Sequence, residues 1–178
     1  MSAPDQVEAQ RTFARWSAEH RFAIEELLET RMAVEATAAA LAATRASESD
    51  IAGLEARHAA VSRASEGRDL SALVDADEAF HEAVMRASNN QLLRKVYSLL
   101  VVEIREFRSK TLGLDGAPAR AVAGHEAVLA AIRCGDVVGA RTAMVDHLLV
   151  LYEEVRDAAA SQLADANELE GASRETFG

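Results

Sequence analysis

The sequence predicts an all-α protein, an antiparallel bundle of about six helices. Alanine, the best helix former, is abundant and occurs in runs such as residues 38–40, whereas the only prolines are Pro4 and Pro118. Aromatic residues make up only 4% of the chain, so strands rich in β-branched and aromatic side chains are not expected. A length of 178 residues suits one domain. These observations exclude a sheet-based catalytic fold.

The first expected helix spans about residues 11–44, with a break near residues 17–21. Ser47 is expected to cap a second helix, because Asp50 stands three residues later and apolar residues follow on one face. Gly67 ends this helix, since glycine commonly follows a helix C-terminus.

A third helix is expected over residues 70–87, with Asp69 as its cap. Residues 88–90 (Ser-Asn-Asn) interrupt the pattern. A fourth helix follows, marked by apolar residues at helical spacing. Its apolar positions are Leu92, Leu93, Val96, Leu99, Leu100 and Ile104.

The clearest expected loop is residues 113–118 (GLDGAP), which combine glycine, aspartate and proline. A fifth helix follows and runs to Arg133. Residues 134–136 (Cys-Gly-Asp) then stop one helix and cap the next, a sixth over about residues 137–160. Short links between long helices indicate antiparallel neighbours.

The charge of the chain argues against nucleic-acid binding. Lys and Arg number 19 against 29 Asp and Glu, so the formal net charge is −10 and the basic residues are not clustered in the sequence. A phosphate backbone would repel such a chain. We therefore do not expect this segment to bind DNA by itself.

The sequence indicates a cytoplasmic protein without a membrane segment. The only cysteine, Cys134, cannot form an internal disulfide, and its simplest role is that of a small buried side chain. The N-terminus lacks the basic and apolar regions of a signal peptide. No apolar stretch reaches the length of about 18 residues that spans a bilayer.

Polar residues interrupt three of the apolar stripes. Asp77 and His81 stand four residues apart in the third helix, where leucines would be expected, so both lie on one helical face. His125 in the fifth helix and His147 in the sixth occupy similar positions. Three imidazoles and one carboxylate form a ligand set for one divalent metal ion: zinc first, with nickel, manganese and iron as alternatives.

Two other interpretations stay open at this point. Histidines on apolar stripes are often hydrogen-bonded core residues, and His58 also falls on such a stripe. In addition, Glu55 with His58, and Glu78 with His81, match the Glu-x-x-His unit of di-iron carboxylate bundles, which would make the protein an oxidase. That alternative leaves His125 and His147 without a role.

Five short segments together resemble the FadR C-terminal (FCD) domain, the effector-binding domain of GntR-type bacterial transcription regulators. The resemblance covers about residues 20–160. The segments are Glu29-Thr-Arg31-Met-Ala-Val-Glu35, Asp77-Glu-Ala-Phe80-His81, Ala87-Ser88-Asn-Asn90, Gly124-His125-Glu126 and Asp146-His147-Leu148.

The resemblance implies a non-enzymatic sensor with an internal cavity that holds one divalent ion and a small organic acid. The implied metal ligands are Asp77, His81, His125 and His147. Arg31 would pair with the acid of the effector, although an i,i+4 surface pair with Glu35 is an equal alternative. Asn90 and Arg105 are further candidates for lining the cavity.

The resemblance also shapes the expected domain organisation. Residues 1–19 are expected to be a leader or partial helix, residues 20–160 the sensor domain, and residues 161–178 a flexible tail. The family carries a winged helix-turn-helix domain before this one, which these first residues are too few to form. DNA binding is therefore expected to belong to a domain absent from this sequence, and the family implies a homodimer.

Overall fold

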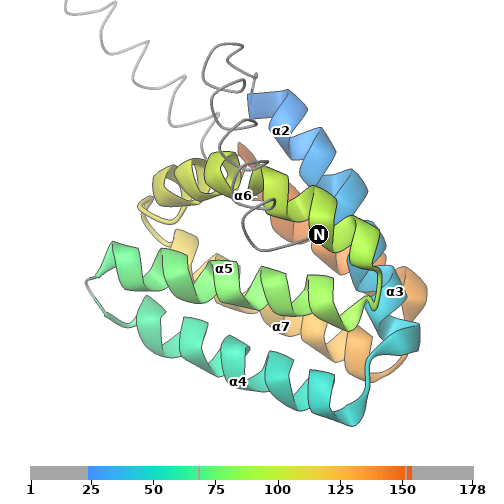
Figure 1. The fold of residues 1–178 in the computed structure, drawn as a ribbon. Helices are drawn as coiled ribbons and strands as arrows, with labels where there is room; N and C mark the ends of the chain where they lie inside the picture. The colour runs from blue at the N-terminus through green and yellow to red at the C-terminus, as the bar shows by residue number, and fades with distance from the viewer. Residues whose placement is uncertain (1–23, 68, 151, 154–178) are drawn as a thin grey trace, which may run out of the picture.

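A computed structural model describes residues 24–67, 69–150 and 152–153, and these residues form helices joined by short links (Figure 1). No strand occurs in these ranges, so the predicted all-α class is confirmed. No helix in the described part has both the length and the apolar character needed to cross a bilayer. The expected leader, the expected break near residues 17–21 and the expected tail lie outside the described residues.

The described helices follow the predicted order. They are α2 (Ile24–Arg31), the π-helical segment η1 (Met32–Ala36), α3 (Thr37–Arg45), α4 (Glu48–Ser65), α5 (Leu70–Ala87), α6 (Gln91–Thr111) and α7 (Ala117–Arg133). Residues 137–150 and 152–153 form the last helical stretch. The π-helical segment, which the sequence did not predict, interrupts the first long helix without ending it.

Two of the predicted caps are present in the structure. The side chain of Ser47 accepts a hydrogen bond from the backbone of Asp50 at 3.2 Å, and Asp50 accepts one from the backbone of Ser47 at 3.0 Å. Asp69 accepts from the backbone of Ala72 at 3.1 Å and starts α5. These bonds satisfy backbone N–H groups that the first turn of a helix leaves without partners.

Two details of the links differ from the prediction. The loop before α7 ends at Gly116, whose φ of 72° suits a residue without a side chain, so Ala117 and Pro118 already belong to the helix. Cys134 is exposed rather than buried, because it lies in the turn that ends α7.

The helices pack as an antiparallel bundle (Figure 1). α4, α5 and α7 lie side by side, with α4 running opposite to both neighbours, and α6 packs across α5 in the opposite direction. α3 contacts α5 and α7, and η1 contacts α5 and α6. The largest apolar side chains buried between these helices are Leu54, Phe80, Met85, Ile104, Ile132, Met144 and Leu148.

α6 faces the core differently from the prediction. Leu92 is 74% exposed and Val96 37% exposed, whereas Tyr97, Ile104 and Arg108 are buried. Leu92 and Val96 of the predicted stripe therefore face outward, whereas Leu93 and Leu100 are partly buried against the core. α6 packs against α5 and η1 with the face that carries the buried Arg108. Apolar spacing alone does not identify this face.

Candidate metal centre

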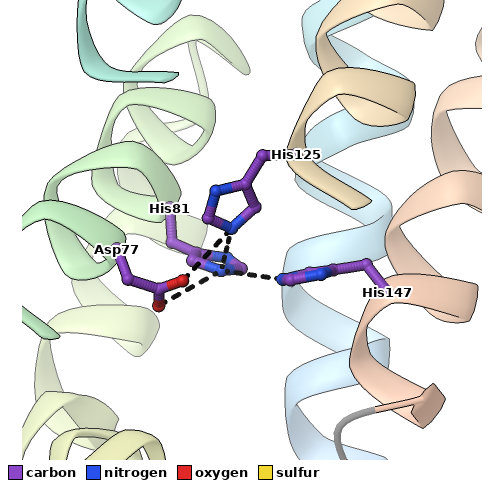
Figure 2. A group of neighbouring side chains, drawn as sticks. All are labelled: Asp77, His81, His125 and His147. Atoms are coloured by element: carbon purple, nitrogen blue, oxygen red, sulfur yellow. Dashed lines mark hydrogen bonds and ion pairs between the residues drawn. The ribbon is translucent and has the colours of Figure 1, made fainter. Parts of the chain in front are cut away.

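Asp77, His81, His125 and His147 meet in the interior of the bundle (Figure 2). Asp77 and His81 come from adjacent turns of α5, His125 comes from α7 and His147 from the last helical stretch. None of the four is more than 4% exposed. The structure thus brings together all four residues that the sequence predicted as metal ligands.

The ligand atoms of the four side chains all lie within 4.8 Å of one another, and several of their separations equal those in the coordination shell of one ion. Nε2 of His81 lies 3.3 Å from Nε2 of His125 and 3.2 Å from Nε2 of His147. Oδ1 of Asp77 lies 3.3 Å from Nε2 of His125. Two ligand atoms that are each about 2.1 Å from a shared ion lie roughly 3.0–3.4 Å apart, depending on the coordination angle.

The hydrogen-bonding groups of the cluster leave ligand atoms that suit a central cation. Nδ1 of His81 lies 2.5 Å from a carboxylate oxygen of Glu35. An ionised carboxylate can only accept a hydrogen bond, so Nδ1 carries the hydrogen of the neutral ring. Nε2 of His81 then offers one lone pair, while the Nε2 atoms of His125 and His147 both point at it (Figure 2). Without an ion, His147 would donate to that lone pair and His125 to Oδ1 of Asp77, at 3.3 Å, whereas a central ion would satisfy all three nitrogens and the carboxylate oxygen at once.

Glu35 supports the cluster from η1. Its second oxygen lies 2.7 Å from Nε of Arg31, and the side chains of both residues are no more than 3% exposed. A carboxylate behind a metal-bound imidazole fixes its tautomer and orientation, which is the arrangement that Glu35 makes with His81. Burial alone would raise the pKa of Glu35, but the nearby Arg31 and His81 hold it far below its ordinary value.

Arg108 supports the cluster from α6. Its Nε lies 2.5 Å from Oδ2 of Asp77, and its Nη2 donates to the hydroxyl of Tyr97 at 3.1 Å. Burial would raise the pKa of Asp77, but Arg108, helped by His81 and His125, holds it well below its ordinary value. The carboxyl of Asp77 is therefore ionised at neutral pH.

His81 and His147 are held in the neutral form that binds metals. Burial is the main cause that lowers the pKa of His81 to about 4. Burial also lowers the pKa of His147 well below its ordinary value, and the neighbouring His125 and His81 add to the effect. Because these two rings are neutral at pH 7, an ion would not have to displace protons from them.

A cavity of about 360 Å³ opens beside the cluster at His147. Its walls are mostly small or apolar, and they come from α7 and the last helical stretch. They are formed by Arg120, Ala123, Gly124, Ala127, Ala143, Asp146, His147 and Val150. Gly124 is packed so closely that a Cβ at this position would overlap the ring of His147.

The three predicted effector residues lie in different environments. Arg31 is buried against Glu35, with its guanidinium 5.8 Å from the centre of the Phe107 ring, so the pair is internal rather than on the surface. The Asn90 side chain caps α6 by accepting from two backbone N–H groups at 3.1 Å. Arg105 is 42% exposed at its side chain and contacts acidic residues of α5, away from the cluster.

The residues of the di-iron alternative do not converge. Nε2 of His58 lies 3.0 Å from Glu126, and Glu55 lies 3.5 Å from Arg133 on the surface. Glu78 pairs with Arg105. Within the described residues, the group with metal-ligand spacing consists of the aspartate and the three histidines of Figure 2, not of these glutamates.

Sequence reasoning missed Glu35 and Arg108 as parts of the site. Arg108 follows Ile104 by four residues, which places a charged residue on a buried stripe and was a usable signal. Glu35 interrupts an apolar, alanine-rich run between Ala33 and Ala43, which is a similar signal. The surface pair with Arg31, given as an alternative, is wrong because both side chains are buried.

Comparison with known proteins gives a consistent family match. The model of the FCD domain matches residues 26–149. The "Putative L-lactate dehydrogenase operon regulatory protein" of Escherichia coli (strain K12) is 31% identical over 135 residues, which cover 74% of this chain and 51% of that protein. The protein of the same name from Shigella flexneri has the same identity and coverage.

A third relative is the "Uncharacterized HTH-type transcriptional regulator in unstable DNA locus" of Streptomyces ambofaciens. It is 32% identical over 87 residues, which cover 49% of this chain and 37% of that protein. The chain thus spans about half the length, or less, of the curated relatives it matches.

Proposed function

This chain belongs to the FCD domain family, and from that premise we propose that it is the effector-sensing part of a GntR-type transcription regulator. It holds one divalent metal ion and binds a small organic acid at that ion. The relatives are named as regulators and not as enzymes, in agreement with the expectation that the chain has no catalytic activity.

The observation that carries the proposal is the convergence of three buried Nε2 atoms and one carboxylate oxygen on a common point. Asp77, His81, His125 and His147 would hold the ion, while Glu35 and Arg108 would orient two of these ligands. Zinc is our first candidate, because an N/O ligand set of four suits it; nickel, manganese and iron would leave positions open for the effector.

The charges around the cluster favour an anionic effector. Arg31 with Glu35, and Arg108 with Asp77, are two buried pairs whose formal charges cancel. Neutral imidazoles add no formal charge. A divalent ion would therefore leave about two uncompensated positive charges in a buried site. An organic acid with one or two carboxylates would offset that charge.

The proposed place of the acid is between the ion and the cavity beside His147. The volume of about 360 Å³ suits a small molecule, and its apolar walls suit a short carbon skeleton. When bound, the ion would supply a positively charged attachment point for the carboxylate. Arg31 would be a second anchor if it exchanged Glu35 for the acid, and Asn90 and Arg105 remain weaker candidates.

DNA binding would belong to a winged-helix domain rather than to this segment, because the net charge of −10 opposes contact with phosphates. We further propose that the regulator acts as a homodimer in the cytoplasm, as the family resemblance implies. The regulatory signal would be the conformational change that binding of the acid causes in this domain.

A thermal-shift titration tests the function. Hydroxy- and dicarboxylic acids are added to the metal-loaded chain and to the chain treated with chelator; L-lactate comes first, because two relatives are named after L-lactate dehydrogenase. The acids should raise the melting temperature only with the ion present, and their neutral amides should not. Equal stabilisation after complete removal of the ion would contradict the proposal.

A further inference from the structure

A second cavity, of about 320 Å³, is lined by residues of α5 and α6. These residues lie toward the end of the two helices where residues 88–90 join them (Figure 1). Its lining is basic. Arg86 comes from the last turns of α5, and Arg94 and Lys95 come from the first turns of α6. Because residues of two helices form it, its shape depends on the packing of the fold and not on one flexible loop.

The charge of this cavity is opposite to that of the chain. Three cations face one carboxylate, that of Glu82, whereas the whole chain has a formal net charge of −10. Over the described ranges, Arg86, Arg94 and Lys95 make no ion pair with a carboxylate within 4 Å. Asp50 of α4 lies close enough to Arg86 for the guanidinium to help lower the pKa of its carboxyl, but the three cations still outnumber the carboxylates of Asp50 and Glu82. The cations repel one another, and a bound anion would relieve that repulsion.

The other lining groups suit a small ligand. Gln91 adds an amide at the rim, while Met85 and the buried ring of Tyr97 form an apolar wall. A volume of about 320 Å³ lies at the lower end of the range of small-molecule sites. Two guanidinium groups can each make paired hydrogen bonds to phosphate or carboxylate oxygens.

We propose that this cavity is a second anion site, which binds a small molecule with at least two negative charges. A phosphate-bearing or a polycarboxylate metabolite has that chemistry. The site is separate from the metal centre, because none of the metal-ligand candidates lines it. It therefore does not depend on the proposed function.

Calorimetric titration of the full chain at constant ionic strength tests the site, with inorganic phosphate and citrate as probes. In the variant Arg86→Gln/Arg94→Gln, the affinity for the tighter probe should fall by about tenfold or more, because hydrogen bonds to charged groups are lost. The control Arg63→Gln/Arg141→Gln removes two exposed arginines outside the cavity and should bind like the wild type.

Further measurements distinguish this anion site from the metal centre and identify the class of its ligand. His147→Ala should bind the same probe with unchanged affinity, because the metal centre is not involved. Tighter binding of phosphate assigns the site to phosphate-bearing ligands, and tighter binding of citrate assigns it to polycarboxylates. The proposal is overturned if neither probe binds. It is also overturned if His147→Ala abolishes binding while the double arginine variant keeps it.

Discussion

Oε2 of Glu35 lies 2.5 Å from Nδ1 of His81, and both side chains are 1% exposed. The contact joins the π-helical segment η1 to α5 in the centre of the bundle. π-Helical turns inside α-helices often occur at functional sites. Here the turn carries the carboxylate that fixes the hydrogen of His81 on Nδ1 and leaves Nε2 to bind an ion.

Glu35→Gln should weaken metal binding, because the amide removes the charge that supports the imidazole. Loss of such a partner typically lowers metal affinity by about 10–100-fold. The matched control is Glu126→Gln, which changes a glutamate 3.0 Å from His58, outside the cluster. Competition with a fluorescent chelator measures both affinities. Equal affinities in the two variants would remove Glu35 from the site.

Gly124→Ala should both destabilise the fold and disturb the metal centre, because the new Cβ would overlap the His147 ring. Gly53→Ala is the control: its Cβ would meet only the end of Arg57 at 3.7 Å, so it should stabilise α4 by roughly 0.5–1 kcal/mol. Urea denaturation with chelator and metal titration give the two readouts. Unchanged metal affinity in Gly124→Ala would show that His147 has room to move.

Arg108→Met should cost about 3–5 kcal/mol of unfolding free energy, because it leaves the buried carboxylate of Asp77 without its cation. Arg105→Met, one turn earlier on α6, removes a guanidinium that is 42% exposed and should cost less than about 1 kcal/mol. Denaturant unfolding of both variants compares them directly. Similar losses would mean that Arg108 is not the counter-charge of Asp77.

The metal-free protein should lose stability as the pH falls from about 6.5 to about 4. His81 has a pKa of about 4 in the fold, against 6.5 ordinarily, so the unfolded chain binds more protons in this window. The contribution of His81 to the free energy of unfolding is fully present above pH 6.5. Its loss on acidification amounts to about 3 kcal/mol. The lowered pKa of His147 acts in the same direction.

Urea midpoints in the presence of chelator, measured through this pH window and above it, check the slope. His147→Ala should give a shallower dependence, since one neutral buried imidazole is gone. The carboxylates Glu35 and Asp77, whose pKa values are lowered from 4.5 and 3.8, add a loss that begins near the acidic end of this window and continues at lower pH. Stability that stayed constant from pH 7 to pH 5 would contradict the assignment of buried neutral histidines.

Local signals explain which parts of the fold could be predicted. Ser47 and Asp69 start helices through bonds to residues three positions ahead, so their effect is readable in the sequence. The buried face of α6 depends instead on which neighbours it meets, and Leu92 is exposed although it continues the apolar pattern. The π-helical segment was not predicted, because its residues have ordinary helix-forming character.

The candidate site divides in the same way. Each of the four metal-ligand candidates stands on an apolar stripe, so helical periodicity alone predicts that its side chain is buried. They are Asp77, His81, His125 and His147. The same rule places Arg108 on the stripe of Ile104, but it does not identify the carboxylate from another element that makes a buried arginine stable. Predicting such a pair requires the packing of α6 and η1 against α5.

Metal analysis of purified protein tests the central claim most directly. The wild-type chain, loaded with zinc and then desalted, should retain one ion per chain by elemental analysis. His147→Ala and Asp77→Ala should lose most of it, and His58→Ala, whose ring contacts Glu126 outside the cluster, should keep it. Equal metal content in the wild type and His147→Ala, or no retained ion in the wild type, would contradict the account.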